Sequence, residues 1–136
     1  MLNYKLVIDT NVFVSSLLKS PSIPSIIVDT VFKRGDIVVV YSDDMLLEYI
    51  DVLNRKKLKI PPITVNTLLS AILKNGEKVS PFPQYVHFSD ESDKKFYETF
   101  KTANADYLIT GNLDDFPQEE GIISPRRFAE ILDIQI

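Results

Sequence analysis

The sequence contains no cysteine, a single histidine and no apolar run as long as a membrane span. Without cysteine the chain can form neither disulfide bonds nor thiolate metal sites, which favours an intracellular protein. A membrane helix needs roughly 20 consecutive apolar residues, and the N-terminus lacks the charged-then-apolar pattern of a secretory signal. The histidine, His87, lies in an apolar segment after two prolines and is expected to have a structural role. These absences predict a cytoplasmic protein without membrane association.

Basic residues are also too few for a typical nucleic-acid-binding protein. The chain has 15 Lys and Arg residues against 19 Asp and Glu residues, a net charge of −4. Contacts with phosphates favour an excess of positive charge. That argument fails if several of the acids bind metal ions, because two divalent cations would bring the protein close to neutral. The net charge therefore leaves a nucleic-acid substrate open.

An apolar strand near the N-terminus ends abruptly in polar residues. The run Leu6 to Ile8 is followed by Asp9, Thr10 and Asn11, after which apolar residues recur at helical spacing. This pattern predicts a buried strand, a tight turn and a helix, with Asp9 at the carboxyl end of the strand. Ligands of open α/β sheets bind at that end of the strands. An Asp after a strand is equally often a helix N-cap, so Asp9 alone does not identify a site.

Strand and helix patterns then alternate along the chain. The segment Ile37–Tyr41 has an unbroken apolar run that is typical of a buried parallel strand, and residues 107–110 and 122–123 are further buried strands. Such alternation predicts a mostly parallel sheet covered on both faces by helices, formed by residues 1–136 as one domain. The helix signals are Gly35 as the C-cap of a helix over residues 24–34, Ser42 as an N-cap, Thr64 as the cap of a helix ending at Asn75 and Gly76, and Ser124 as the cap of the last helix.

Acidic residues follow several of these elements. In this architecture Asp9 and Asp115 follow strands at the carboxyl edge of the sheet, while Glu48 and Asp93 lie near the starts of helices that face the same edge. Four converging carboxylates without His or Cys favour Mg²⁺ or Mn²⁺ over Zn²⁺. Each acid also has an ordinary structural interpretation, as a partner of a helix dipole, a solvated side chain or a turn residue.

At these residues the chain resembles a known family. Four motifs occur in order: Val-Ile-Asp-Thr-Asn at residues 7–11, Leu-Glu-Tyr at 47–49, Asp90-x-x-Asp93-x-x-Phe96, and Ala-Asp-Tyr-Leu-Ile-Thr-Gly-Asn at 105–112. Together they resemble a PIN domain, and most closely the PIN-family toxins of bacterial and archaeal toxin–antitoxin modules. The similarity extends from about residue 5 to 130. It implies a three-layer α/β/α sandwich and a ribonuclease dependent on Mg²⁺ or Mn²⁺.

The resemblance also implies roles for particular residues. Asp9, Glu48 and Asp93 match the main acids of the family, and Asn11 and Thr110 match the polar residues that support them. The family's usual fourth acid falls at Asn112, which has a neutral oxygen and is expected to weaken a second metal site. The substitute expected for it is Asp115, which is preferred over Asp114.

Partners and rival functions remain open at this stage. Contacts with the RNA backbone are expected from Arg55, Lys56 and Lys57, although a cluster of cations at a helix end is also favourable without any ligand. A toxin would pair with a small antitoxin, and the helices at residues 24–34 and 64–75 offer apolar surfaces for a homodimer. The main rival is a non-catalytic PIN domain that acts as an interaction module. Receiver-like domains and haloacid-dehalogenase-type phosphatases require acids or a lysine at positions where this sequence has none.

Overall fold

The computed structural model describes residues 3–135, which contain a single five-stranded sheet with the order β3-β2-β1-β4-β5. Every pairing between neighbouring strands is parallel, so the predicted mostly parallel sheet is parallel throughout the described residues. The strands are β1 (Tyr4–Ile8), β2 (Ile37–Tyr41), β3 (Glu77–Lys78), β4 (Tyr107–Ile109) and β5 (Ile122–Ile123).

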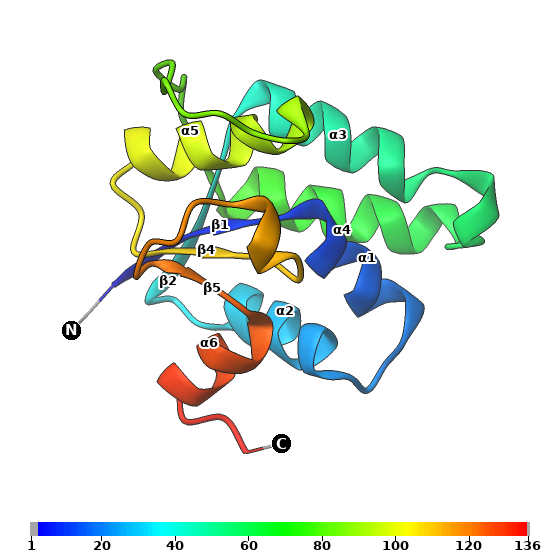
Figure 1. Cartoon of the computed structure of the whole chain (residues 1–136). Helices are drawn as coiled ribbons and strands as arrows, with labels where there is room; N and C mark the ends of the chain where they lie inside the picture. Colours follow the sequence, from blue (N-terminus) through cyan, green and yellow to red (C-terminus); the bar gives the residue numbers. More distant parts are fainter. Residues whose placement is uncertain (1–2, 136) are drawn as a thin grey trace.

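Helices cover both faces of this sheet. The α-helices are α1 (Thr10–Leu18), α2 (Ile23–Lys33), α3 (Asp43–Leu53), α4 (Pro62–Asn75), α5 (Lys94–Thr102) and α6 (Pro125–Ile131), and the 3-10 turns are η1 (Lys56–Leu58), η2 (Glu91–Asp93) and η3 (Leu113–Asp115). Helices α3 and α5 lie on one side of the strands, and α2 and α6 lie on the other (Figure 1). The predicted α/β/α sandwich is therefore confirmed.

The central strand β1 determines where polar residues meet. Its last three residues, Leu6, Val7 and Ile8, are completely buried between the helical layers, as expected for the middle of a parallel sheet. Ile8 is in register with Ile109 of β4, and the backbone N–H of Asp9 donates to the carbonyl of Ile109 at 2.9 Å. Strands β1 and β4 consequently end at the same level, so the residues after them are neighbours.

Two of the predicted helix caps are confirmed. The hydroxyl of Ser42 accepts a hydrogen bond from the backbone N–H of Met45 at 3.2 Å and begins α3. The hydroxyl of Ser124 accepts from Arg127 at 3.1 Å and begins α6. In both cases a side-chain oxygen satisfies a backbone donor that the first turn of a helix leaves unpaired.

Other predicted caps are wrong. Helix α2 spans Ile23–Lys33, one residue earlier than expected, because Ser22 caps it, and Arg34 rather than Gly35 holds the C-cap position. Helix α4 begins at Pro62 with Pro61 as its N-cap, so Thr64 lies inside the first turn; a proline is well suited to that turn because it has no N–H to satisfy.

Gly76 ends α4 as predicted, but for a different physical reason. Its φ of −86° is accessible to any residue, so it is not a left-handed cap. A Cβ at this position would lie 2.4 Å from the carbonyl oxygen of Ile72 and 3.0 Å from the ring of Tyr41. Glycine therefore allows α4 to close against β2 before the chain enters the short edge strand β3.

None of the helices in residues 3–135 is individually long and apolar enough to cross a membrane. Only α1 and α2 taken together reach the required length and composition, and they are bent by 108° at the break between them.

Candidate functional site

Asp9 follows the buried end of β1 and is only 5% exposed. One of its carboxylate oxygens accepts hydrogen bonds from the Thr110 hydroxyl at 2.8 Å and from the Asn11 amide at 3.1 Å. Although Asp9 occupies the N-cap position of α1, its side chain makes no capping hydrogen bond. Burial, followed by the negative charge of Glu48, raises the pKa of Asp9, while the hydrogen bond from Thr110 opposes that rise. Asp9 therefore holds the N-cap position, but its side chain is directed to Thr110 and Asn11 instead of capping the helix.

Asn11 joins the ends of the two central strands. Its amide N–H donates to Asp9, while its side-chain oxygen accepts from the backbone N–H of Gly111 at 3.1 Å. On the β4 side, the backbone N–H of Asn112 donates to the Thr110 hydroxyl at 3.0 Å. These contacts fix the orientation of the Asp9 carboxylate, because both of its donors are themselves held by other groups.

Glu48 projects from α3 toward Asp9, and both of its carboxylate oxygens are engaged. One accepts from the Thr10 hydroxyl and the other accepts from the Lys95 ammonium at 2.8 Å. The next residue, Tyr49, is completely buried, and its hydroxyl donates to the carbonyl of Ile8 at 2.5 Å. This contact holds α3 against the end of β1 and thereby keeps Glu48 beside Asp9.

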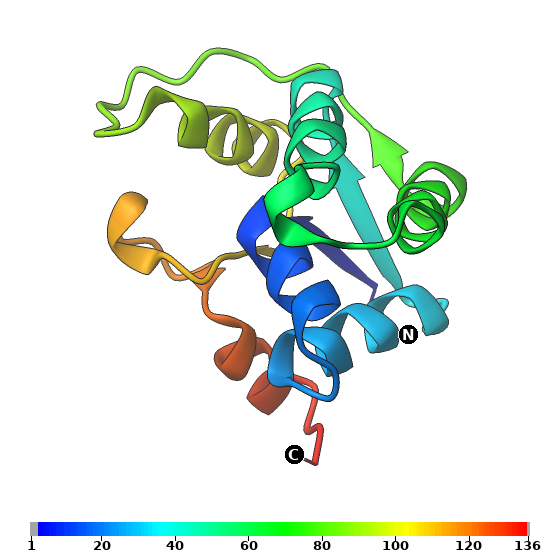
Figure 2. The ribbon, with the colours of Figure 1, turned by 90° about the vertical axis from the view of Figure 1, so that its right-hand side faces the viewer.

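The pKa of Asp93 is sensitive to the negative charges of several neighbouring acids. It ends η2 and precedes α5, and its pKa is raised to about 6. Burial is the largest cause, followed by the negative charges of Asp9, Asp90, Asp115 and Glu48. The carboxylates of these residues therefore lie close enough to oppose the ionisation of Asp93. Figure 2 views the side at which β1 ends, where α1, α3, α5 and the η3 turn surround that end.

The η3 turn carries the remaining residues predicted for the site. Asn112, Asp114 and Asp115 are exposed, and residues 111–115 line a cavity of about 460 Å³ together with Ser124. Asp115 also lines a second cavity of about 220 Å³ with His87. His87 is exposed, so it does not pack in the core.

The donor set of this site suits a hard divalent cation by its chemistry. Ionised carboxylates are acceptor-only oxygen ligands of the kind that Mg²⁺ and Mn²⁺ prefer, and their mutual repulsion is relieved by a cation. Within residues 3–135, however, no three Asp, Glu or His side chains are arranged to hold a metal ion as they stand. The described residues therefore form a cluster of acids rather than a completed metal site.

The comparison with protein families provides the identification. A family model described as a PIN domain matches residues 5–114, which is most of the chain. The chain belongs to the PIN-domain family. No curated protein matches it. PIN domains are generally nucleases that depend on divalent metals, which agrees with the acidic composition of this site.

Three residues of this PIN domain that contact its acids or hold them in place were missed by sequence reasoning. The sequence pattern predicts only a turn at Thr10 and a family motif at Tyr49, and it gives no signal for Lys95. Each acts through a polar atom at the end of its side chain, on a group up to 47 positions away in the sequence. Periodicity identifies the face of a helix but not the partner of a single hydroxyl or ammonium group.

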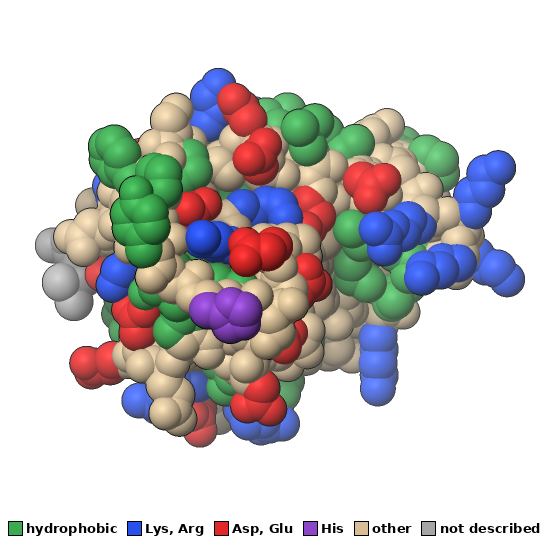
Figure 3. All heavy atoms as spheres, turned by 45° about the horizontal axis from the view of Figure 1, so that its top comes forward, with side chains coloured by type: hydrophobic (Ala, Val, Ile, Leu, Met, Phe, Trp, Pro, Cys, Tyr) green, Lys and Arg blue, Asp and Glu red, His purple; other side chains and the backbone are tan. Residues whose placement is uncertain are grey.

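The predicted RNA-binding residues lie apart from the acids of the PIN domain. Arg55, Lys56 and Lys57 are exposed in the connection between α3 and α4, and Arg55 forms an ion pair with Asp51 at 3.2 Å. Figure 3 shows Lys and Arg side chains gathered at this end of the molecule, while Asp and Glu side chains surround other cationic side chains near the centre of the same face.

Proposed function

We propose that this PIN domain is an endoribonuclease that hydrolyses RNA phosphodiester bonds with Mg²⁺ or Mn²⁺. The observation that carries the proposal is the cluster of acids around the end of β1, where Asp9 is buried and the charges of Asp9, Asp90, Asp115 and Glu48 all act on Asp93. Repulsion among neighbouring negative charges does not stabilise a folded chain. Such a cluster of acids is typical of a site that binds cations. The family to which the chain belongs supplies the reaction class.

The proposed roles follow from the position of each residue. Asp9 and Asp93 would hold the cation nearest the strand ends, with Glu48 binding it directly or through water, and Asp115 would supply the charge that Asn112 lacks. Bound divalent cations supply Lewis acidity, which activates water and stabilises the leaving oxygen of a phosphodiester. Asn11 and Thr110 would keep the Asp9 carboxylate in one orientation, since both donate to the same oxygen.

Replacement of one carboxylate tests this proposal. Asp9→Asn keeps the shape of the side chain but removes its charge, so we expect the variant to fold and to lose RNA cleavage in Mn²⁺ and Mg²⁺. Cleavage by the unaltered protein should stop in EDTA. The matched control is Asp44→Asn, an exposed residue in the first turn of α3, which should retain activity. Cleavage by Asp9→Asn at the rate of the unaltered protein would contradict the proposal.

The alternative function is a catalytically inactive PIN domain that acts as a protein or RNA interaction module. The observation that favours it is Asn112, which stands where the family usually has an acid. Calorimetric titration with Mn²⁺ separates the two functions. The enzyme should bind Mn²⁺ and lose that binding in Asp9→Asn, whereas an inactive module should show the same heats for both proteins.

We further propose that the protein is the cytoplasmic toxin of a toxin–antitoxin pair. It is supported by the motifs at residues 7–11 and 105–112, which resemble PIN-family toxins. Induced expression of the chain in a bacterial host should stop growth and degrade RNA, and expression of Asp9→Asn should do neither. Equal growth of both cultures at equal protein levels would remove the toxin role without affecting the reaction assigned to the site.

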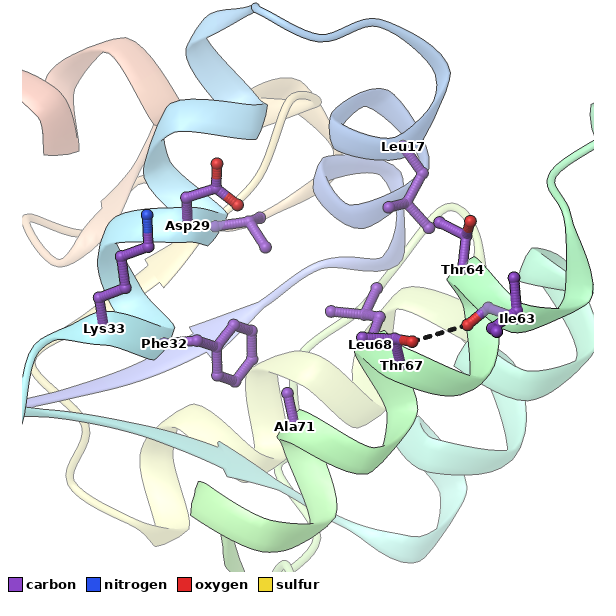
Figure 4. A pocket seen from close by; sticks show the side chains of 10 residues that line it. Leu17, Asp29, Phe32, Lys33, Ile63, Thr64, Thr67, Leu68 and Ala71 are labelled. Atoms are coloured by element: carbon purple, nitrogen blue, oxygen red, sulfur yellow. Dashed lines mark hydrogen bonds between the residues drawn. The ribbon is translucent and has the colours of Figure 1, made fainter.

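The proposed partners are a small antitoxin and a second copy of the chain. An apolar groove of about 390 Å³ lies between α1, α2 and α4, with Phe32 and Leu68 facing each other across it (Figure 4). Ala71 and Ile63 line the same groove, and Ile63 is 76% exposed. Light scattering of the purified chain tests the homodimer: a dimer that depends on this groove should dissociate in Ala71→Glu and persist in Lys19→Glu, which lies outside it.

A further inference from the structure

Lys95 extends from the first turn of α5 into the cluster of acids. Its ammonium group lies 2.8 Å from a carboxylate oxygen of Glu48 and also donates to the carbonyl oxygen of Ser92. The ammonium is 5.4 Å from the centroid of the Phe96 ring. The side chains of Lys95 and Glu48 are only 20% and 23% exposed, so this ion pair is shielded from solvent more than an ordinary surface pair.

Both carboxylate oxygens of Glu48 accept a hydrogen bond. One oxygen accepts from Lys95, and the other accepts from the Thr10 hydroxyl. Each carboxylate oxygen has a second lone pair, so a cation can bind Glu48 beside these donors. It then lies within a few ångströms of the Lys95 ammonium, and the two positive charges repel each other, whereas the neutral Thr10 hydroxyl carries no such charge.

Lys95 brings a positive charge into the cluster of acids. In the part of the chain that the structure describes, it is the one Lys or Arg that forms an ion pair with Asp9, Glu48, Asp93 or Asp115. Its positive charge also lowers the pKa of Asp90, although the hydrogen bonds from Ser92 are the larger cause. The ammonium is thus a cation already located among the acids that the proposed reaction assigns to metal binding.

We propose that Lys95 is a resident countercation that competes with the divalent metal for Glu48 and thereby sets the metal affinity of the site. The inference rests on the proposed function, because it concerns the same carboxylates. Lysine suits this role since its compact ammonium is carried on a flexible stem and can move away without rearrangement of the backbone. Lys95 is accordingly a positioning residue, which acts on the metal site through Glu48.

Affinity for Mn²⁺, measured on the full chain by calorimetry and by electron paramagnetic resonance, tests this role without any measurement of activity. Lys95→Met keeps the apolar stem beside Phe96 and removes the charge. We expect Mn²⁺ to bind this variant at least about tenfold more tightly, because a positive charge within a few ångströms of the ion is removed. Lys95→Arg keeps the charge and should bind Mn²⁺ no more tightly than the unaltered protein. Lys94→Met, a neighbouring lysine on the same helix, is the matched control and should leave the affinity unchanged.

The outcomes separate the role of Lys95 from the proposed function. Mn²⁺ binding with the same affinity in the unaltered protein, Lys95→Met and Lys95→Gln would overturn the role of Lys95 and leave the metal site standing. Weaker binding in both neutral variants, with circular dichroism showing that they are folded, would overturn it as well. Absence of Mn²⁺ binding in all of these proteins would overturn the proposed function together with the inference that rests on it.

Discussion

The hydroxyl of Thr110 donates a hydrogen bond of 2.8 Å to the carboxylate of Asp9, a residue 101 positions earlier in the chain. The two residues follow the paired strands β4 and β1, and Asp9 is almost completely buried. Burial penalises the charged form of this carboxylate and raises its pKa, and the hydrogen bond from Thr110 opposes that rise. A residue at the end of one strand thus stabilises the charged form of the acid at the end of its neighbour.

Thr110→Val, which removes the hydroxyl at nearly constant volume, should destabilise the protein by about 1 kcal/mol at about pH 7. The loss should be smaller at about pH 4, where Asp9 is increasingly protonated and the hydrogen bond to its charged form matters less. Urea unfolding at both pH values measures the effect. Thr30→Val, which removes a hydroxyl bonded within α2, is the control and should show no dependence on pH. An equal loss at both pH values in Thr110→Val would contradict the account of Asp9.

Asp115 and Asp114 are adjacent on η3 but should behave differently. The charge of Asp115 contributes to the raised pKa of Asp93, and Asp114 is not among the contributing charges. Asp115→Asn should therefore bring the pKa of Asp93 below about 6 in an NMR titration of the carboxyl carbons, and Asp114→Asn should leave it unchanged. If Asp115 replaces the missing fourth acid, its variant should also cleave RNA about tenfold more slowly. Identical behaviour of the two variants would remove Asp115 from the site.

The raised pKa of Asp93 also predicts how stability depends on pH. The native state holds a proton on Asp93 more strongly than the unfolded chain, so its contribution to stability is present below about pH 4 and is lost as the pH rises to about 6. Asp93→Asn should therefore be more stable than the unaltered, metal-free protein at about pH 7, by on the order of 1 kcal/mol after allowance for solvent screening. Thermal unfolding in EDTA measures this difference, which should disappear at about pH 4.

The control for that measurement is Glu91→Gln, on the same η2 turn as Asp93. Its carboxylate is exposed and is not one of the charges that raise the pKa of Asp93. The control should show little change in stability at either pH. Addition of Mn²⁺ should stabilise the unaltered protein more than Asp93→Asn, which reverses the order of the two proteins. If Asp93→Asn were less stable than the unaltered protein in EDTA at neutral pH, repulsion between Asp93 and its neighbouring acids could not be a net destabilising interaction.

The exposed cations between α3 and α4 should affect RNA binding through charge alone. Replacement of Lys56 and Lys57 by Gln should reduce the slope of log affinity against log salt by about 1.4, since each contact with a single-stranded phosphate contributes about 0.7. The comparison is a double variant of Lys19 and Lys74, which lie on other elements. Fluorescence anisotropy with a labelled RNA at several salt concentrations provides the slopes. Equal slopes in the two double variants would exclude Lys56 and Lys57 from the RNA contact.

The order of the elements was predictable because each carries its own local signal. The apolar run Ile37–Tyr41 is β2, and the serine caps Ser42 and Ser124 start helices as their types suggest. Failures occurred where one local rule competed with another. At residues 61–64 the capping preference of Thr64 competes with the suitability of Pro62 for the first turn, and the proline prevails. Gly35 is of a type that often ends helices, but α2 ends before it.

The site was predictable only in part. The topology of a parallel sheet was enough to predict Asp9 at the carboxyl edge, because it follows a buried strand, whereas the role of Thr110 beside it was implied only by the resemblance to PIN domains. The ion pair between Glu48 and Lys95 was not predictable, because it depends on the rotation of two long side chains from helices that are far apart in sequence. Whether the predicted acids act as metal ligands stays a prediction, which the metal titrations will test.

The strand order also has a consequence for synthesis on the ribosome. Because β1 pairs with β4, the acid that follows β1 acquires its hydroxyl donor only after residue 110 has left the ribosomal tunnel. Contacts between residues so distant in sequence form late in folding, since the intervening loop must close first. A nascent chain would therefore carry most of its helices before it had a functional site. For the ribonuclease proposed above, such late assembly would delay activity until Thr110 has been synthesised and β4 has paired with β1.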